Sequence, residues 1–217
     1  MTRLTPRQVK AQQTKKKLLE TALALFSQKG FDNVTVDEIV AASQTSKGAF
    51  YVHFKSKYEV FLEKFKEIDN FYETFIQSLP VDIKASEKLL RLTESQMVYL
   101  RDCLGKDMLR TVYMNALVPN PDNYFTNTDR PLYKIVHSFA VEGQETGEFT
   151  RELSAMEITM LVTRCMRGSL YDWCMFEDFD LVAEASKFMR IALRGLTTPD
   201  GGKPSGKQRN PVSLKQG

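Results

Sequence analysis

The stretch of sequence that decides the fold covers residues 35–57 and reads TVDEIVAASQTSKGAFYVHFKSK. Thr35 and Glu38 form a capping-box pattern, in which the hydroxyl accepts a hydrogen bond from a backbone N–H and the carboxylate reaches back to the capping residue. This pattern predicts a short helix that starts at the next residue and stops at the polar residues before Ser46. Ser46 can cap a second short helix that runs to His53. The stretch therefore predicts two short helices joined by a tight polar turn.

Upstream of this stretch, apolar residues recur at helical spacing between Val9 and Lys29. Gly30 follows, and glycine is the residue that most commonly ends a helix. The apolar positions are Leu18, Leu19, Ala22, Leu25 and Phe26. Three helices in this first part of the chain match the helix-turn-helix plan, in which the second helix of the pair enters the major groove of DNA.

Downstream, the sequence predicts a larger helical body. An amphipathic stretch from Lys57 to Leu79 is expected to form one connecting helix. Further helical patterns cover residues 86–104, 106–117, 131–145, 155–173 and 181–196, and a loop is predicted over residues 118–123. No segment shows the sustained alternation of a β-strand. We predict an all-α fold with a helix-turn-helix DNA-binding domain, a larger helical domain and a disordered basic tail, over residues 1–56, 57–196 and 197–217.

Composition and charge indicate a soluble protein with a basic front end. Hydrophobic residues make up 42% of the 217 positions, which is enough for a sizeable core. No apolar run approaches the roughly 18 residues of a membrane span, and the N-terminus is too polar for a signal peptide, so we expect a cytoplasmic protein. Residues 1–66 contain 12 Lys and Arg against 6 Asp and Glu, whereas residues 67–196 contain 14 against 20. This split suggests that the front end meets a polyanion, although local fluctuation can give the same counts.

Cysteine and histidine usage gives no sign of a metal site or a cofactor. Cys103, Cys165 and Cys174 are odd in number, form no CxxC pair and adjoin no plausible set of histidine ligands. We interpret them as small buried apolar residues. The sequence has two histidines, no glycine-rich phosphate loop and no recognisable nucleophile with its base, so it does not suggest an enzyme.

The second helix of the pair carries side chains suited to DNA. Lys47 and Tyr51 lie one turn apart and share a face, while Phe50 and Phe54 are expected to point into the domain. We expect Lys47 to contact a base edge, because an ammonium group can donate to O6 and N7 of guanine. Gly48 has no side chain and permits close approach of the DNA backbone.

Phosphate contacts are expected from polar residues around this face, because such contacts set the register of a protein on DNA. The candidates are Thr45, Ser46, Tyr51, His53 and Lys57, together with Thr35 at a helix N-terminus. Each has a structural alternative. Thr35 and Ser46 are helix caps with or without DNA, Lys57 can belong to a solvated connection, and His53 can be structural. Lys15–Lys17 form either a charged helix face or a further backbone contact.

Residues 46–57, SKGAFYVHFKSK, resemble the DNA-binding domain of the TetR family of bacterial transcriptional regulators. The likeness covers about residues 12–62 and extends through Ala22, Phe26, Gly30, Phe31, Thr35 and Ile39. Two positions depart from the family pattern. Gln44 stands where the turn usually has glycine, and a left-handed backbone there would cost on the order of 1 kcal/mol. Thr45 stands where an apolar branched residue is more common, which puts any direct transfer of base preferences in doubt.

The resemblance implies a homodimeric repressor of a bacterial cytoplasm that binds a pseudo-palindromic operator and is released by a small effector. Two-fold symmetry would place the two heads about 34–36 Å apart. The candidates for the dimer interface are Leu161, Cys165, Leu181, Ala185, Phe188, Met189, Ala192 and Leu196. The candidates for contact with an apolar or aromatic effector are Phe71, Phe75, Met97, Tyr113, Tyr133, His137, Met160, Arg164 and Trp173. Residues of both sets can instead belong to the core of one chain.

Two other functions stay open. The first is a DNA-binding protein of the same fold without a small-molecule effector, whose DNA affinity no small molecule lowers. The second is an enzyme or ligand carrier with an inert helix-turn-helix. The basic tail, with Lys203, Lys207, Arg209 and Lys215, either adds nonspecific attraction to DNA or serves as a solubilising end.

Overall fold

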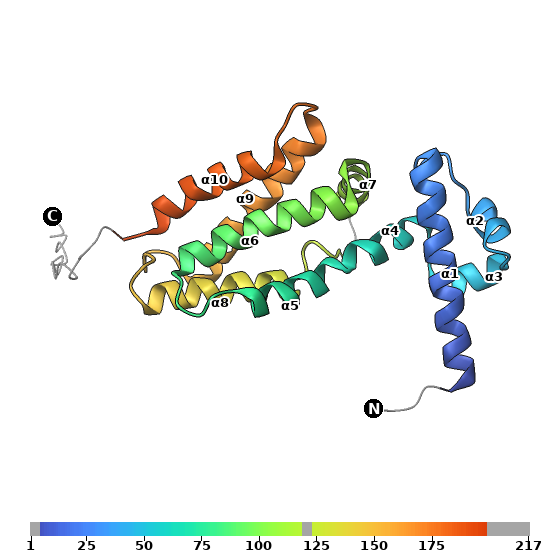
Figure 1. Ribbon diagram of the computed structural model, residues 1–217, viewed down its shortest axis with the longest axis horizontal. Coiled ribbons are helices and arrows are strands. Elements are labelled where there is room, and N and C mark those ends of the chain that lie inside the picture. The colour runs from blue at the N-terminus through green and yellow to red at the C-terminus, as the bar shows by residue number, and fades with distance from the viewer. Residues whose placement is uncertain (1–4, 119–122, 199–217) are drawn as a thin grey trace, which may run out of the picture.

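A computed structural model describes residues 5–118 and 123–198 (Figure 1). The first three helices are α1 (Pro6–Lys29), α2 (Val36–Ala42) and α3 (Lys47–His53). They are followed by α4 (Lys57–Lys66), α5 (Ile68–Ser78), α6 (Ala85–Tyr99), the π-helix η1 (Leu100–Leu104), α7 (Lys106–Ala116), α8 (Pro131–Glu145), α9 (Ala155–Met175) and α10 (Leu181–Leu196). Within the described residues the one β-type pairing is an isolated bridge between Phe149 and Thr197. The predicted all-α fold is confirmed.

Helices α1, α2 and α3 form a small head, because each buries an apolar face against the others. The buried residues that build its core include Leu18, Phe26, Ile39 and Phe50. The rings of Phe26 and Phe61 stack with their centroids 4.6 Å apart, which joins the first turns of α4 to this core. Helix α4 thus packs in the head and continues toward the body (Figure 1). The domain boundaries themselves stay a prediction.

The single helix predicted over Lys57–Leu79 is wrong, because the chain turns at Glu67 and divides into α4 and α5. The backbone N–H of Glu67 donates to the Lys64 carbonyl oxygen over 3.1 Å, which closes a tighter turn than that of an α-helix. Phe65 and Ile68 on either side are both buried. The apolar spacing therefore continues through the break, and the sequence pattern alone does not reveal it.

Two other helix ends differ from the predicted ones. Helix α1 starts at Pro6 rather than near Val9, since Thr5 and Gln8 form a capping box and proline suits the first turn. Thr5 and Gln8 are polar, so apolar periodicity does not detect this helix start. The pattern over residues 86–104 ends in the π-helix η1, where the N–H of Gly105 donates to the carbonyl oxygen of Leu100 over 3.0 Å.

Helices α6, α8, α9 and α10 form the bulk of the body (Figure 1). Each packs against two of the others, α5 packs on α8, and α7 packs on α9 and on α4. The core between them is aliphatic and includes Leu89, Leu92, Val136, Ile158 and Val162. Because α7 packs on α4, the body directly contacts the helix that enters the head.

The end of α10 is tied to the segment that follows α8. The N–H of Thr150 donates to the Leu196 carbonyl oxygen over 2.8 Å, and the N–H of Thr198 donates to that of Glu148 over 3.0 Å. Residues 197 and 198 therefore correct the predicted start of the disordered tail, since this pairing holds them. The rest of that tail, residues 199–217, lies outside the described residues, as do loop residues 119–122.

Cys165 and Cys174 are buried as expected, whereas Cys103 is exposed on η1, so the expectation of burial is wrong for it. Apolar spacing predicts burial only along a regular α-helix, and η1 is a π-helix. In the described ranges, no helix is both long and apolar enough to cross a membrane. The same ranges contain no cluster of three or more His, Cys, Asp or Glu side chains that could hold a metal ion.

Candidate nucleic-acid interface and ligand cavity

The turn between α2 and α3 contains a left-handed residue. Gln44 has a φ of +51°, so the left-handed conformation considered for this position is confirmed. It costs a non-glycine residue about 1 kcal/mol, which the packing of the two helices must offset. The Thr45 hydroxyl lies 2.9 Å from the Ser43 hydroxyl, and Ser43 is buried. The side chain of Thr45 is therefore engaged within the turn.

Helix α3 buries one side and exposes the other. Phe50 and Phe54 are buried, which confirms their expected inward direction. On the other side, Tyr51 is 50% exposed and Val52 is 79% exposed, and Lys47 is also exposed. Sequence reasoning missed Val52, because a valine in a short helix is assigned to the core by default. An exposed valine beside Tyr51 can contact the methyl group of thymine.

Gly48 has room for a side chain on α3. A Cβ added there would meet only the Oγ of Ser46, at 3.8 Å. Packing within the chain therefore does not require glycine, and glycine in a helix is less favourable than alanine by about 1 kcal/mol. Close approach of an external partner such as the DNA backbone gives a reason for this residue.

An ion pair across the two helices holds Lys47. Its Nζ lies 2.9 Å from a carboxylate oxygen of Asp37 on α2, and both side chains are exposed. The hydrogen bond from Lys47 to Asp37 raises the pKa of the lysine, which therefore stays charged. Contact with a guanine requires the ammonium group to leave this partner. The charge of Asp37 would also repel phosphate.

Thr35 and Ser46 both act as helix caps. The Oγ1 of Thr35 accepts from the N–H of Glu38 over 3.2 Å, and the Oγ of Ser46 accepts from that of Ala49 over 3.0 Å. The Glu38 carboxylate accepts from Lys29 and from the N–H of Thr35, which lowers the pKa of Glu38 to about 2. A carboxylate thus already occupies the N-terminus of α2, where the sequence predicts a phosphate contact near Thr35.

Lys57 has a structural role. Its Nζ donates to the carbonyl oxygens of Phe31 and Val34 over 2.7 and 3.0 Å and lies 4.3 Å from the centroid of the Phe31 ring. The ammonium group therefore joins the start of α4 to the loop before α2, which argues against its predicted phosphate contact. His53 is half-buried, with its ring edge-on to Phe54, and its phosphate contact stays a prediction.

The first half of α1 is a basic segment that extends beyond the rest of the head (Figure 1). Residues 6–17 contain five basic residues and no acidic residue. Lys15 pairs with Glu63 of α4, whereas Arg7 and Lys10 lie in the exposed stretch over residues 5–13. The two exposed cations add positive charge suited to a phosphate backbone.

The candidate dimer residues divide into two groups. Cys165, Leu181, Ala185, Met189 and Leu196 are buried within the chain, which corrects their assignment to an interface. They are core residues, because apolar stripes at helical spacing serve either purpose. Phe188 is exposed, while Leu161 and Ala192 are half-buried on the same side. Tyr171 and Ile191 are exposed at matching helical positions and extend this apolar face of α9 and α10.

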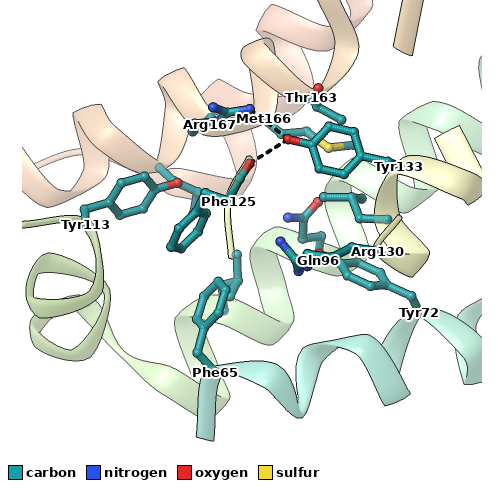
Figure 2. Close-up of a pocket in the computed structure, with 13 residues that line it drawn as sticks. Phe65, Tyr72, Gln96, Tyr113, Phe125, Arg130, Tyr133, Thr163, Met166 and Arg167 are labelled. Carbon is teal, nitrogen blue, oxygen red and sulfur yellow. Dashed lines mark hydrogen bonds between the residues drawn. The ribbon is translucent and has the colours of Figure 1, made fainter. Parts of the chain in front are cut away.

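A cavity of about 40 Å³ lies inside the body and has walls from α4 to α9 (Figure 2). Its apolar and aromatic walls include Phe65, Tyr72, Tyr113, Phe125, Tyr133 and Met166. Its polar walls include Gln96, Arg130 and Arg167. Two of the predicted effector residues, Tyr113 and Tyr133, are thus brought together.

The other predicted effector residues do not line this cavity, so their contact with an effector stays a prediction. Phe75, Met97 and Trp173 are buried in the core, Phe71 stacks on Tyr99, Met160 is half-buried, and Arg164 is exposed. The Nδ1 of His137 lies 3.4 Å from the Thr159 hydroxyl. Gln96, Arg130 and Arg167 supply the polarity instead. They come from three separate segments with no shared spacing, so no pattern in the sequence could have grouped them.

Hydrogen bonds fix the polar side of the cavity. The Tyr133 hydroxyl donates to the Phe125 carbonyl oxygen over 2.9 Å and accepts from the Nη2 of Arg167 over 3.2 Å (Figure 2). The guanidinium group of Arg130 lies 3.6 Å from the centroid of the Tyr124 ring. Burial raises the pKa of Tyr113, so its phenol is neutral at ordinary pH.

The capped pair of helices in an all-helical chain defines a helix-turn-helix protein. Residues 18–63 match the family model described as bacterial regulatory proteins, tetR family. The head of this chain therefore contains a DNA-binding domain of the TetR type.

Sequence relatives match over only part of the chain. The chain is 41% identical over 71 residues to the uncharacterized HTH-type transcriptional regulator YuxN of Bacillus subtilis, which is 32% of this chain and 23% of YuxN. A longer match, 29% identical over 141 residues, is with the HTH-type transcriptional repressor DhaR of a Mycobacterium species and covers 63% of this chain and 70% of DhaR. The match to AcrR of Shigella flexneri, 43% identical over 53 residues, covers 24% of this chain. The matched segments span only 23% of YuxN and 25% of AcrR.

Solved structures match over nearly the whole chain and show the fold. The Thermus thermophilus FadR, a TetR-family repressor crystallised with lauroyl-CoA, has a TM-score of 0.71 at 22% identity, covering 88% of this chain and 100% of its own. A TetR-family regulator of Pectobacterium atrosepticum has a TM-score of 0.70 at 18% identity, covering 90% and 99%.

Proposed function

We propose that this chain is a homodimeric transcriptional repressor, and not an enzyme, that reads a pseudo-palindromic operator with α3. The observation that carries the proposal is the outer surface of α3, formed by Lys47, Gly48, Tyr51 and Val52, which the fold does not use for packing. This surface offers the ammonium group of Lys47, the phenol of Tyr51, the apolar side chain of Val52 and an accessible backbone at Gly48. Such groups suit base and phosphate contacts in a major groove.

A dimer is proposed through the apolar face of α9 and α10 defined above. Phe188 and Ile191 supply exposed apolar side chains there, and a Cβ on Gly168 would lie 4.0 Å from the Phe188 ring, so the two helices adjoin closely at this point. Two such helices from each partner would bury this face in a four-helix interface. The arrangement gives each operator half-site one copy of α3.

Release by an effector is proposed through α4. Phe65 of α4 lines the cavity, and Phe61 on the same helix stacks in the core of the head. A ligand that moves the wall at Phe65 would therefore move the helix that carries the head. Such a ligand lowers DNA affinity if it prefers the dimer in which the head spacing fits the operator poorly.

The test is to select binders from random duplex DNA with the purified chain at near-physiological salt. Enrichment of a pseudo-palindrome with half-sites about one helical turn apart is expected. The selected duplex then serves as the probe for an effector screen, which includes lauroyl-CoA, the ligand of FadR. Failure to enrich any sequence would contradict the proposal.

The second candidate is a DNA-binding protein of the same fold that has no effector. The small volume of the cavity, about 40 Å³, is the observation that favours it. It shares the expected operator, but it predicts that no small molecule lowers the affinity for that operator. The effector screen therefore separates the two candidates.

A further inference from the structure

Two buried polar atoms in the cavity walls have no hydrogen-bond partner among the described residues: Gln96 Oε1 and Arg130 Nε. The exposed fractions of these side chains are only 4% and 7%. Both side chains line the cavity (Figure 2). Buried polar groups nearly always have partners, so an unpaired acceptor and an unpaired donor in the walls of one cavity point to a bound molecule.

The charges around the cavity favour an anion. Arg130 is balanced by Asp69, since its Nη2 lies 3.1 Å from a carboxylate oxygen of that residue. The same carboxylate accepts from the Tyr124 hydroxyl over 2.8 Å. Arg167 also lines the cavity, and no ion pair among the described residues includes it. One positive charge of the two guanidinium groups thus remains for a ligand to balance.

The remaining walls favour a flat ring. Phe65, Tyr72, Tyr113, Phe125 and Tyr133 place five aromatic rings around the cavity. Tyr113 and Phe125 stack with their centroids 5.5 Å apart, so one wall is already a layered pair of rings. Aromatic rings pack in offset stacks or edge to face, and a planar ligand fits both arrangements.

We propose that the cavity binds a small aromatic acid with one carboxylate and one hydrogen-bond donor. The carboxylate accepts from Arg130 Nε, and the charge of Arg167 in the same cavity balances it. The donor meets Gln96 Oε1, and the ring packs among the aromatic side chains. This inference rests on the proposed function for its role, because it names the chemical class of the effector.

Binding requires the cavity to widen. Its volume of about 40 Å³ has room for a few water molecules, which is less than an aromatic acid needs. Met166 is a wall that adapts easily, since its thioether chain is flexible. Phe65 is the wall that belongs to α4, so widening on that side reaches the head through the same helix.

The experiment is titration calorimetry of the full chain without DNA, with the three isomers of hydroxybenzoate as probes. We expect at least one isomer to bind at millimolar concentration or below. The methyl ester of that isomer, which lacks the charge, and its methoxy counterpart, which lacks the donor, should each bind about tenfold more weakly or worse.

Three variants assign the contacts. Arg130→Lys keeps the charge but removes Nε, and Gln96→Met keeps the length but removes the amide. Each should weaken the best isomer about tenfold or more. Arg91→Gln is the matched control, because Arg91 is an exposed residue of α6 that pairs with Glu87, and it should leave binding unchanged. Thermal melts of all variants establish that they are folded. If Arg130→Lys does not fold, Gln96→Met and the methoxy ligand still test the donor contact.

The proposal is overturned if no isomer binds, if the ester binds as tightly as the acid, or if folded Gln96→Met binds like the unaltered chain. These results do not depend on DNA. An operator found by selection together with no binding of these acids would leave the repressor function standing and remove this inference. Binding of an acid together with failure to select any operator would support this inference and contradict the repressor function.

Discussion

At the scale of single residues, Gly48 separates what folding requires from what DNA binding requires. Gly48→Ala should leave the free energy of unfolding unchanged or raise it by up to about 1 kcal/mol, because the added Cβ makes only an ordinary contact with Ser46 Oγ and alanine favours a helix. The same methyl group should weaken operator binding about tenfold, because it stands where the DNA backbone approaches. Urea unfolding and fluorescence anisotropy with the selected duplex measure the two effects.

Gly143→Ala is the matched control for this substitution. A Cβ on Gly143 would lie 2.2 Å from the ring of Phe149, which is buried. Overpacking of this kind costs about 1–3 kcal/mol, so this variant should lose stability. If Gly48→Ala loses comparable stability, or binds DNA like the unaltered chain, then Gly48 is not a DNA-approach residue.

Asp37 should restrain Lys47 in the free protein. Asp37→Asn removes the ion-pair partner and one negative charge near the DNA, so operator affinity should rise by about threefold to tenfold at low salt. The gain should shrink at high salt, because both side chains are exposed. Lys47→Ala should instead lower affinity by about 1–3 kcal/mol and relax sequence discrimination. Equal affinities for Asp37→Asn and the unaltered chain would show that the two contacts do not compete.

Lys57 should contribute to the stability of the head. Lys57→Met removes the ammonium group that bonds to the Phe31 and Val34 carbonyl oxygens, so the free energy of unfolding should fall by about 1–2 kcal/mol. Urea unfolding measures the change. Unaltered stability combined with uniformly weaker binding to all DNA sequences would instead restore the phosphate contact predicted from the sequence.

At the scale of elements, the capping box that starts α2 should make the head sensitive to acid. The pKa of Glu38 is lowered from 4.5 to about 2 by Lys29 and Thr35, so its ionised form stabilises the fold above about pH 4.5. That stability is lost as the pH falls toward about 2. The difference in Tm between the unaltered chain and Glu38→Gln should therefore shrink between about pH 6 and about pH 3. A constant difference across this range would contradict the assignment.

Local signals predict the elements that depend on local chemistry. The caps at Thr35 and Ser46 place α2 and α3 correctly, because a hydroxyl before a helix acts through neighbouring backbone N–H groups. The break at Glu67 escapes prediction because apolar spacing continues across it. The cavity escapes for another reason: Gln96, Arg130 and Arg167 meet only once the body has folded. Burial likewise decides which apolar stripes are core, since Met189 and Phe188 are neighbours in sequence but only Phe188 is exposed.

At the scale of the whole molecule, the proposed repressor depends on the apolar face of α9 and α10. Ile191 is 59% exposed on that face, so Ile191→Glu should leave the chain folded while placing a charge where the two copies meet. Sedimentation should then show a monomer. Affinity for the pseudo-palindrome should fall about 100-fold or more, because linkage of the two heads is lost. Val81→Glu, at an exposed position before α6, should remain dimeric and bind normally. A dimeric Ile191→Glu chain with intact DNA affinity would place the interface elsewhere, and the spacing of the two copies of α3 would then have to be set by a different surface.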